Sequence, residues 1–139
     1  MTRFVLDASM TMAWCFEDEA DEETDAALRS LDGDDALTPA VWPLEVANTL
    51  LIGERKRRTT PAQIAAFLAT IESLRIRIEP EDPTRAFNVV LPLARSTGLS
   101  SYDATYLELA IRANLPLATL DEPLRKAARK HGVPLIPTD

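Results

Sequence analysis

Short apolar segments alternate with amphipathic helical patterns along the whole chain, and this alternation limits the possible folds more than any other feature of the sequence. The first segment, RFVLDAS, indicates a buried strand that runs into a helix beginning near Ser9. Strands that alternate with helices favour an α/β fold, with a parallel sheet flanked by helices on both faces. Strands are expected at 4–6, 36–38, 75–79, 117–120 and 134–136, and helices from Ser9 to about Leu31, from Pro43, at 61–73, at 83–97, at 101–112 and from Glu122.

Residue types at the ends of these segments support the boundaries. Thr60 is a suitable N-cap for the helix at 61–73, and Gly98 is a suitable C-cap for the helix at 83–97. RIRIE at 75–79 alternates apolar and charged residues, as is typical of a strand near a sheet edge with one solvated face. In the helix from Pro43, the predicted buried stripe consists of Leu44, Ala47, Leu50 and Leu51.

Length and composition place the chain among small globular proteins. The 139 residues, 46% of them hydrophobic, suit one domain over 1–139 with a real core. No apolar run is long enough to span a bilayer and the start lacks a signal-peptide pattern, so we expect a cytoplasmic protein without membrane contact. The single Cys15 and single His131 cannot assemble a structural zinc site, so any metal would be held by oxygen.

The formal charge of −7 argues against a uniformly basic nucleic-acid-binding surface, although the acidic excess is local. The segment EDEADEETD at 17–25 carries seven acids and no base, and acids and bases are equal in number without it. The basic residues gather in runs that are either solvated helix faces or phosphate contacts. The candidates for RNA contact are Arg55, Lys56, Arg57, Arg58, Arg125, Lys126 and Arg129.

Two carboxylates follow predicted strands directly. Asp7 comes after FVL, and Asp121 comes after LATL at 117–120. Ligand sites of open parallel sheets lie outside the carboxyl ends of the strands, so both acids are placed for a site. Each acid also has an ordinary use as the N-cap of the helix that follows it.

Two further carboxylates stand in the first turns of predicted helices. Asp103 lies on the apolar face of the helix at 101–112, where it could complete a capping box with Ser100 or belong to a site. Glu45 follows Pro43 by two residues, and it is either an exposed acid favoured by the helix dipole or a site residue. Four carboxylates at one rim of a sheet would repel one another unless they took up protons or bound a cation such as Mg²⁺ or Mn²⁺.

Four segments together resemble the PIN-domain ribonucleases, and specifically the VapC toxins of toxin–antitoxin modules. The segments span nearly the whole chain in the order of that family, and each is weak alone while the ordered set is specific. Ser9 and Thr119 match polar positions of the family beside its acids, and each could equally be a capping hydroxyl. The matching segments are FVLDAS, WPLEVANTLL, GLSSYDATYLELA and LATLDEPLRKAA.

The resemblance implies a single PIN-like α/β domain and an endoribonuclease that uses Mg²⁺ or Mn²⁺, the toxin of a type II toxin–antitoxin system. It implies that Asp7, Glu45, Asp103 and Asp121 form a catalytic, metal-binding cluster, with Ser9 and Thr119 in support. It also implies a homodimer silenced by a cognate antitoxin that covers the acidic site. A PIN-like module that binds RNA or a partner without cutting is the alternative.

Other hydrolase and signalling classes fit the sequence less well. A haloacid-dehalogenase-like phosphatase needs a second aspartate two residues after Asp7, where Ser9 stands. A response-regulator receiver needs adjacent acids near the first strand and a late lysine, and neither is in place. Ser-His-Asp and Cys-His hydrolases need a positioned histidine, whereas His131 falls at the closing turn of a helix.

Overall fold

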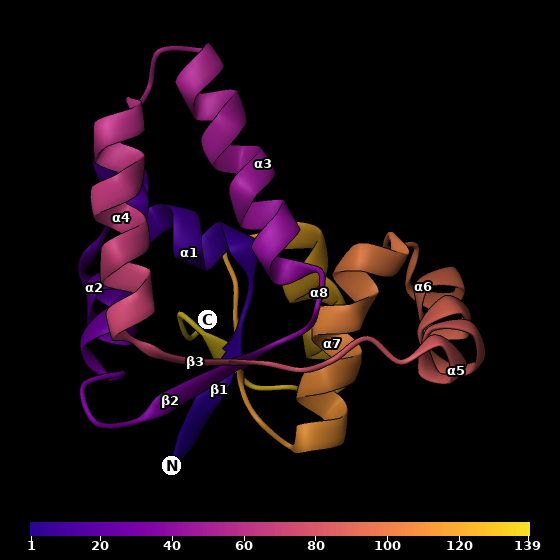
Figure 1. Cartoon of the computed structure of the whole chain (residues 1–139). Helices are drawn as coiled ribbons and strands as arrows, with labels where there is room; N and C mark the ends of the chain where they lie inside the picture. The colour runs from indigo at the N-terminus through magenta and orange to yellow at the C-terminus, as the bar shows by residue number, and fades with distance from the viewer.

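The computed structural model describes all residues, 1–139, as a single α/β domain (Figure 1). The strands are β1 (Thr2–Leu6), β2 (Asp35–Thr38), β3 (Arg75–Ile78), β4 (Leu117–Ala118) and β5 (Leu135–Ile136). The helices are α1 (Ala8–Cys15), the 3-10 helix η1 (Glu17–Glu19), α2 (Glu22–Arg29), α3 (Trp42–Arg55), α4 (Pro61–Ser73), α5 (Pro83–Arg85), the π-helical η2 (Ala86–Val90), α6 (Leu91–Thr97), α7 (Ser101–Ala113) and α8 (Glu122–Lys130).

All five strands are parallel and lie in the order β3-β2-β1-β4-β5, which confirms the predicted fold class. From β1 the chain first moves outward to β2 and β3, and then crosses back to β4 and β5. Because crossovers between parallel strands are right-handed, α1–α4 cover one face of the sheet and α5–α8 the other. β3 is an edge strand, as the alternation in RIRIE indicates. The order in which strands are added to the sheet reverses between β1 and β4, which makes this pair the topological switch point. The carboxyl ends of β1 and β4 therefore flank the crevice where ligands bind in such sheets.

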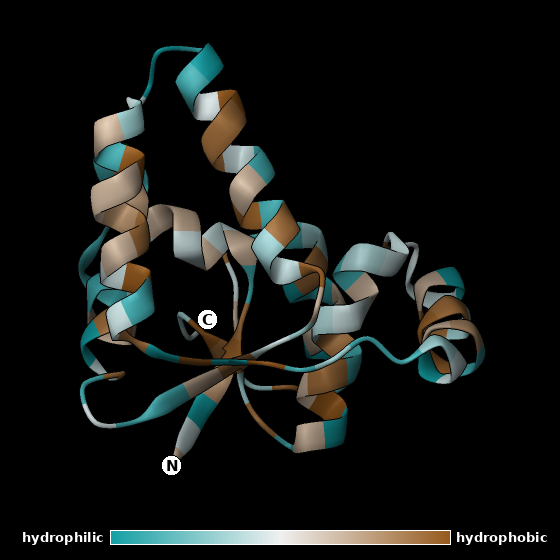
Figure 2. Ribbon diagram, in the orientation of Figure 1, coloured by the Kyte–Doolittle hydropathy of each residue, from teal (hydrophilic) through white to brown (hydrophobic).

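The core lies between the sheet and its helices. Its buried apolar side chains come from the strands and from α1, α3, α7 and α8. In Figure 2, brown stretches lie at the centre of the sheet and along α3 and α7. Phe4, Leu6 and Leu117 of the central strands are at most 1% exposed. Leu107 and Leu124 bring α7 and α8 against the same core. None of the helices combines the length and the apolar character that a membrane span requires.

The predicted caps explain most element boundaries. The backbone N–H of Gln63 donates to Thr60 Oγ1, and the backbone N–H of Thr60 donates to Gln63 Oε1. These two bonds complete a capping box at the start of α4. Gly98 ends α6 and Asn114 ends α7, each in the left-handed conformation. The helical stretch before Leu31 breaks at the acidic segment, where η1 separates α1 from α2.

The predicted stripe of α3 is wrong for three of its four residues. Leu44 is 75% exposed, and Ala47 and Leu51 are also exposed, whereas Leu50 is buried. The buried face instead carries Trp42 and Val46 with Leu50, at a spacing of four residues. Apolar residues surround most of α3, so periodicity alone does not select a face.

The bond that selects the buried face of α3 joins it to α1. The indole N–H of Trp42 donates to Thr11 Oγ1 at 3.0 Å, and Thr11 Oγ1 donates to the Asp7 carbonyl at 2.8 Å. The side of α3 with Ala47 and Leu51 turns instead toward α4, and together they form an apolar groove of about 340 Å³. In Figure 1, α3 and α4 rise above the sheet as an antiparallel pair.

Candidate functional site

The predicted acids lie around the topological switch point between β1 and β4. Asp7 directly follows β1 and caps α1, and Asp121 follows β4 and caps α8. Asp103 lies in the first turn of α7, and Glu45 lies in the first turn of α3. Four helices therefore begin at this rim, and their N-terminal dipoles favour negative charge there.

Asp7 is the most buried of the four acids, at 4% exposure. Its Oδ1 accepts the Met10 amide at 2.9 Å and the Ser9 hydroxyl at 2.8 Å, and its Oδ2 accepts the Thr119 hydroxyl. Burial raises the pKa of Asp7 to about 7; the hydrogen bonds from Met10, Thr119 and Ser9 oppose this, and the negative charge of Asp121 adds to it. The three hydrogen bonds to the Asp7 carboxylate thus compensate only part of the cost of burying its negative charge.

Ser9 and Thr119 connect the two strand ends. Ser9 Oγ accepts the Leu120 amide at 2.9 Å, and Thr119 Oγ1 accepts the Asp121 amide at 3.0 Å. The two hydroxyl oxygens are 3.3 Å apart, and Thr119 is fully buried. Because both hydroxyls also donate to Asp7, they fix its carboxylate relative to the turn that carries Asp121. The sequence predicts a supporting or a capping use for these residues, and in the structure they both orient Asp7 and support the turn after β4.

Asp121 and Asp103 are half-buried and lie close enough to influence each other. Asp121 Oδ2 accepts the Leu124 amide at 3.0 Å, which is the capping bond expected from the sequence. Ser100 Oγ accepts the Asp103 amide at 3.0 Å, but Asp103 returns no bond to the Ser100 amide, so no capping box forms. Burial, followed by the charge of Asp121, raises the pKa of Asp103. The Asp103 carboxylate therefore closes no capping box, and its interaction with Ser100 only partly offsets the rise in its pKa.

Glu45 has a partner that sequence reasoning missed. The phenol of Tyr106 donates to Glu45 Oε1 across 61 positions of sequence. Burial raises the pKa of Glu45, with the Tyr106 bond opposing and the Asp103 charge adding to the rise. Tyr106 is 1% exposed, and its own pKa is raised by burial and by the charges of Glu45, Asp7 and Asp103. Tyr106 lies three residues after Asp103 on the same helix face, and this spacing is the signal that could have placed it near the acids.

The four acids form a chain in which each influences the next. The charge of Asp121 adds to the rise in the pKa of both Asp7 and Asp103, and the charge of Asp103 adds to the rise in the pKa of Glu45. As they stand, no three acidic, His or Cys side chains are close enough together to enclose a cation. Mg²⁺ does not require such a cage, since it keeps several waters and is commonly bound through one or two carboxylates. The donor set of oxygen ligands with uncompensated charge therefore fits a hydrated divalent cation.

The predicted basic residues separate into paired and free groups. Arg125 is 8% exposed and donates to the Thr119 carbonyl at 2.9 Å and the Pro137 carbonyl at 2.7 Å, so it is a buried structural residue and not a surface contact. Arg129 pairs with Asp139 and Glu122. Lys126 is exposed and makes no ion pair.

The other basic run lies at the tip of the α3–α4 pair. Arg55, Lys56 and Arg57 are exposed there without ion pairs. Arg58 is paired with Asp18 and Glu19 and stacks 4.2 Å over the Phe16 ring, which ties the tip to the acidic segment. Because α3 has 14 residues, this tip is about 20 Å from the helix start that carries Glu45.

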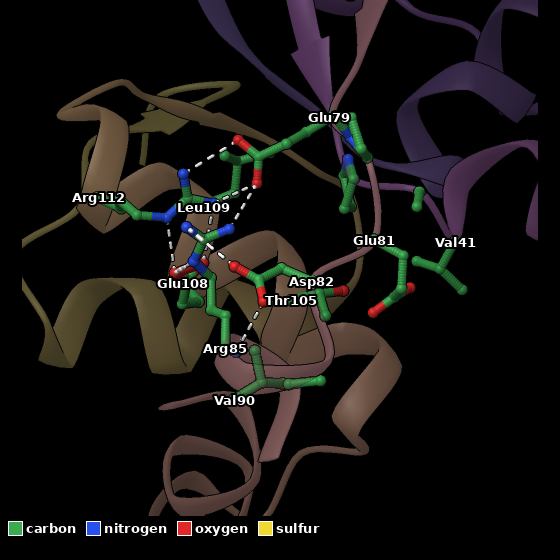
Figure 3. A pocket seen from close by; sticks show the side chains of 14 residues that line it. Val41, Glu79, Glu81, Asp82, Arg85, Val90, Thr105, Glu108, Leu109 and Arg112 are labelled. Carbon is green, nitrogen blue, oxygen red and sulfur yellow. Dashed lines mark hydrogen bonds and ion pairs between the residues drawn. The ribbon is translucent and has the colours of Figure 1, made fainter. Parts of the chain in front are cut away.

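A second charged cleft lies between the segment after β3 and α7 (Figure 3). Arg112 Nε is 2.7 Å from Glu108 Oε1, and its Nη1 is 3.0 Å from Glu79 Oε2. Arg85 reaches the same two glutamates at 3.3 and 3.4 Å. Each arginine is matched by carboxylates, so these ion pairs give the cleft a structural explanation.

Comparisons with known proteins agree with this fold. A family model described as the PIN domain matches residues 4–130. Among solved structures, the crystal structure of PAE2754 from Pyrobaculum aerophilum is similar, with a TM-score of 0.69 and 21% identity over 99% of this chain and 93% of that chain. At that identity the likeness concerns the fold alone. A comparison with curated proteins gave no match.

Proposed function

This chain belongs to the PIN-domain family, and from that membership and its acidic rim we propose that it is a Mg²⁺- or Mn²⁺-dependent endoribonuclease, the toxin of a type II toxin–antitoxin module of the VapC kind. PIN domains are in general metal-dependent nucleases. The observation that carries the proposal is the chain of four carboxylates at the N-termini of four helices: Asp7 and Asp121 follow β1 and β4 and cap α1 and α8, and Glu45 and Asp103 lie in the first turns of α3 and α7.

The residues divide the work according to their surroundings. Asp103 and Asp121 are half-buried and have oxygens free to hold the cation directly or through water. Asp7 is held rigidly and supplies a charge that burial leaves unsatisfied. Glu45 keeps Oε2 free while Tyr106 holds Oε1, so it can ligate or accept a proton from an attacking water. A bound Mg²⁺ or Mn²⁺ would lower the pKa of a water and offset phosphate charge.

A non-catalytic PIN-like module that binds RNA or a partner is the second candidate. The buried Thr119 and the paired hydroxyls around Asp7 argue against it, because a binding surface does not need a carboxylate held at this energetic cost. Metal binding by the wild-type protein without cleavage of any RNA would favour this candidate.

The experiment is cleavage of a mixed cellular RNA pool by the purified protein in Mg²⁺, Mn²⁺ or EDTA. Asp103→Asn removes one carboxylate charge while the Asp103 amide keeps its bond to Ser100. Asp25→Asn, on the exposed face of α2, is the matched control. We expect metal-dependent cutting by the wild type and the control, and none by Asp103→Asn with an unchanged melting temperature. Undiminished cutting by Asp103→Asn would reject the assignment.

The proposed partners follow from the same site. RNA is the substrate, and the cognate antitoxin would insert an arginine-bearing segment between the carboxylates, because guanidinium pairs well with carboxylate. We also propose a homodimer. Light scattering on the purified chain, with and without any copurified protein, tests the dimer, and a monomer at all concentrations would reject it. RNA cleavage in the presence of an arginine-bearing peptide tests the antitoxin mode, and undiminished cleavage would count against it.

A further inference from the structure

A groove with charged residues along one wall runs along α8, between this helix and the end of α6. It encloses about 580 Å³, and only two of its ten lining residues are hydrophobic. The side chains that carry charge or can take it up come from α8 and its C-terminal end, and hydroxyls of Ser96 and Thr97 line the opposite wall. The charged or titratable lining residues are Glu122, Lys126, Lys130 and His131.

One end of the groove opens at the acidic rim. Glu122 directly follows Asp121, and the lining residues Gly98 and Leu99 lead into the turn that begins α7 with its Asp103. At 1.5 Å per residue, Lys126 is about 7 Å along α8 from Asp121, and Lys130 is about one turn further on. The groove is thus a continuation of the site on the face that α8 presents to α6.

The lysines of this groove are available for a ligand. Lys126 and Lys130 are exposed and take part in no ion pair. The one acidic lining residue, Glu122, already accepts Arg129 Nη1 at 3.0 Å. Arg125 is paired with Asp139, and Arg129 is shared between Glu122 and Asp139. Within a chain of net charge −7, the groove therefore holds positive charge that no carboxylate of the protein neutralises.

We propose that this groove binds the sugar–phosphate backbone of the RNA strand whose scissile phosphate lies at the carboxylates. The inference rests on the proposed nuclease function and adds the direction in which the strand leaves the site. Lys126 and Lys130 are four residues apart on one helix face, so each can contact a separate phosphate. The unpaired ammonium groups of these two lysines, with the hydroxyls of Ser96 and Thr97 opposite, suit the phosphates and sugars of such a strand.

Salt dependence gives the expected size of the effect. Each phosphate contact on a single strand adds about 0.7 to the slope of log affinity against log salt, so two contacts add about 1.4. That slope corresponds to about a 25-fold contribution to affinity at 0.1 M salt relative to 1 M salt. Neutralising both lysines should therefore weaken binding about 25-fold at 0.1 M salt and have little effect at 1 M.

The test measures fluorescence anisotropy of a labelled single-stranded RNA over a salt series, in EDTA and in the Asp103→Asn background, so that no cleavage occurs. Lys126→Gln/Lys130→Gln is compared with Arg29→Gln/Arg75→Gln, an equal charge change at the amino end of the sheet. All four residues are exposed, so melting curves should agree with the parent. A second pair, Lys56→Gln/Arg57→Gln, tests the tip of α3 in the same assay.

We expect the groove pair to lower the slope by about 1.4 and the amino-end pair to leave it unchanged. An unchanged slope in the groove pair, or an equal decrease in the amino-end pair, would overturn the proposal. Cleavage by the wild-type active site is scored separately in Mg²⁺. A protein that never cuts RNA but shows the groove-dependent slope would refute the nuclease and retain the groove, whereas cutting without that slope would do the reverse.

Discussion

Asp7→Asn should make the metal-free protein more stable at pH 8, although it removes a residue of the proposed active site. Burial raises the pKa of Asp7 from 3.8 to about 7, so the folded chain keeps a proton that the unfolded chain has released between these values. The folded state binds more protons in that interval, and the free energy of unfolding therefore falls as pH rises from about 4 to about 7. At 1.36 kcal/mol per pKa unit, the loss reaches up to about 4 kcal/mol.

The measurement is urea unfolding in EDTA at pH 4 and pH 8, for the wild type, Asp7→Asn and the exposed control Asp25→Asn. Asparagine can still cap α1 and carries no charge to desolvate. We expect near-equal stabilities at pH 4, a gain of about 2 to 4 kcal/mol for Asp7→Asn at pH 8, and no gain for the control. Mg²⁺ should reduce the difference at pH 8. If Asp7→Asn is no more stable than the wild type at pH 8, the ionised Asp7 carboxylate does not destabilise the metal-free fold, and the reasoning is refuted.

Three further predictions follow from particular contacts. Thr119→Val keeps the volume but removes a hydroxyl that orients a proposed ligand, so Mn²⁺ affinity measured by calorimetry should fall about 10- to 100-fold; an unchanged affinity would remove this role. Arg125→Gln should lower the free energy of unfolding by about 2 kcal/mol or more, because buried carbonyls lose their donor, whereas Lys126→Gln should stay within about 0.5 kcal/mol; equal effects in urea would contradict the burial assigned to Arg125. Leu50→Ala should cost about 2 to 5 kcal/mol and Leu44→Ser about 0.5 kcal/mol or less, and the reverse order would restore the stripe that periodicity suggested.

Local signals were sufficient for the fold because each boundary depends on neighbouring residues. Thr60 caps α4 through a bond to a residue three positions away, and Gly98 ends α6 through its own backbone conformation. The face of α3 was not predictable in this way. It depends on the bond between Trp42 and Thr11, which are 31 positions apart and belong to different helices.

In the candidate site, too, local patterns predicted the positions of residues but not the contacts between residues far apart in the sequence. Asp7 and Asp121 had to lie at one edge because both follow parallel strands, and their capping use proved compatible with a place in the acidic rim. The bond from Tyr106 to Glu45 spans the interior between two helices, and no local pattern encodes it. Arg125 appeared in a basic run, and only the fold of the segment after β5 makes it a buried donor to the Pro137 carbonyl.

The most direct test of the proposed metal-dependent nuclease measures Mn²⁺ binding and RNA cleavage on the same samples of the wild type and Asp103→Asn. The carboxylate account predicts that the wild type reaches half-maximal cleavage near the Mn²⁺ concentration at which half of its sites are filled. It also predicts that Asp103→Asn shifts both curves to higher Mn²⁺ or abolishes them. Cleavage that persists in EDTA, or a variant that binds Mn²⁺ and cuts RNA as the wild type does, would contradict it.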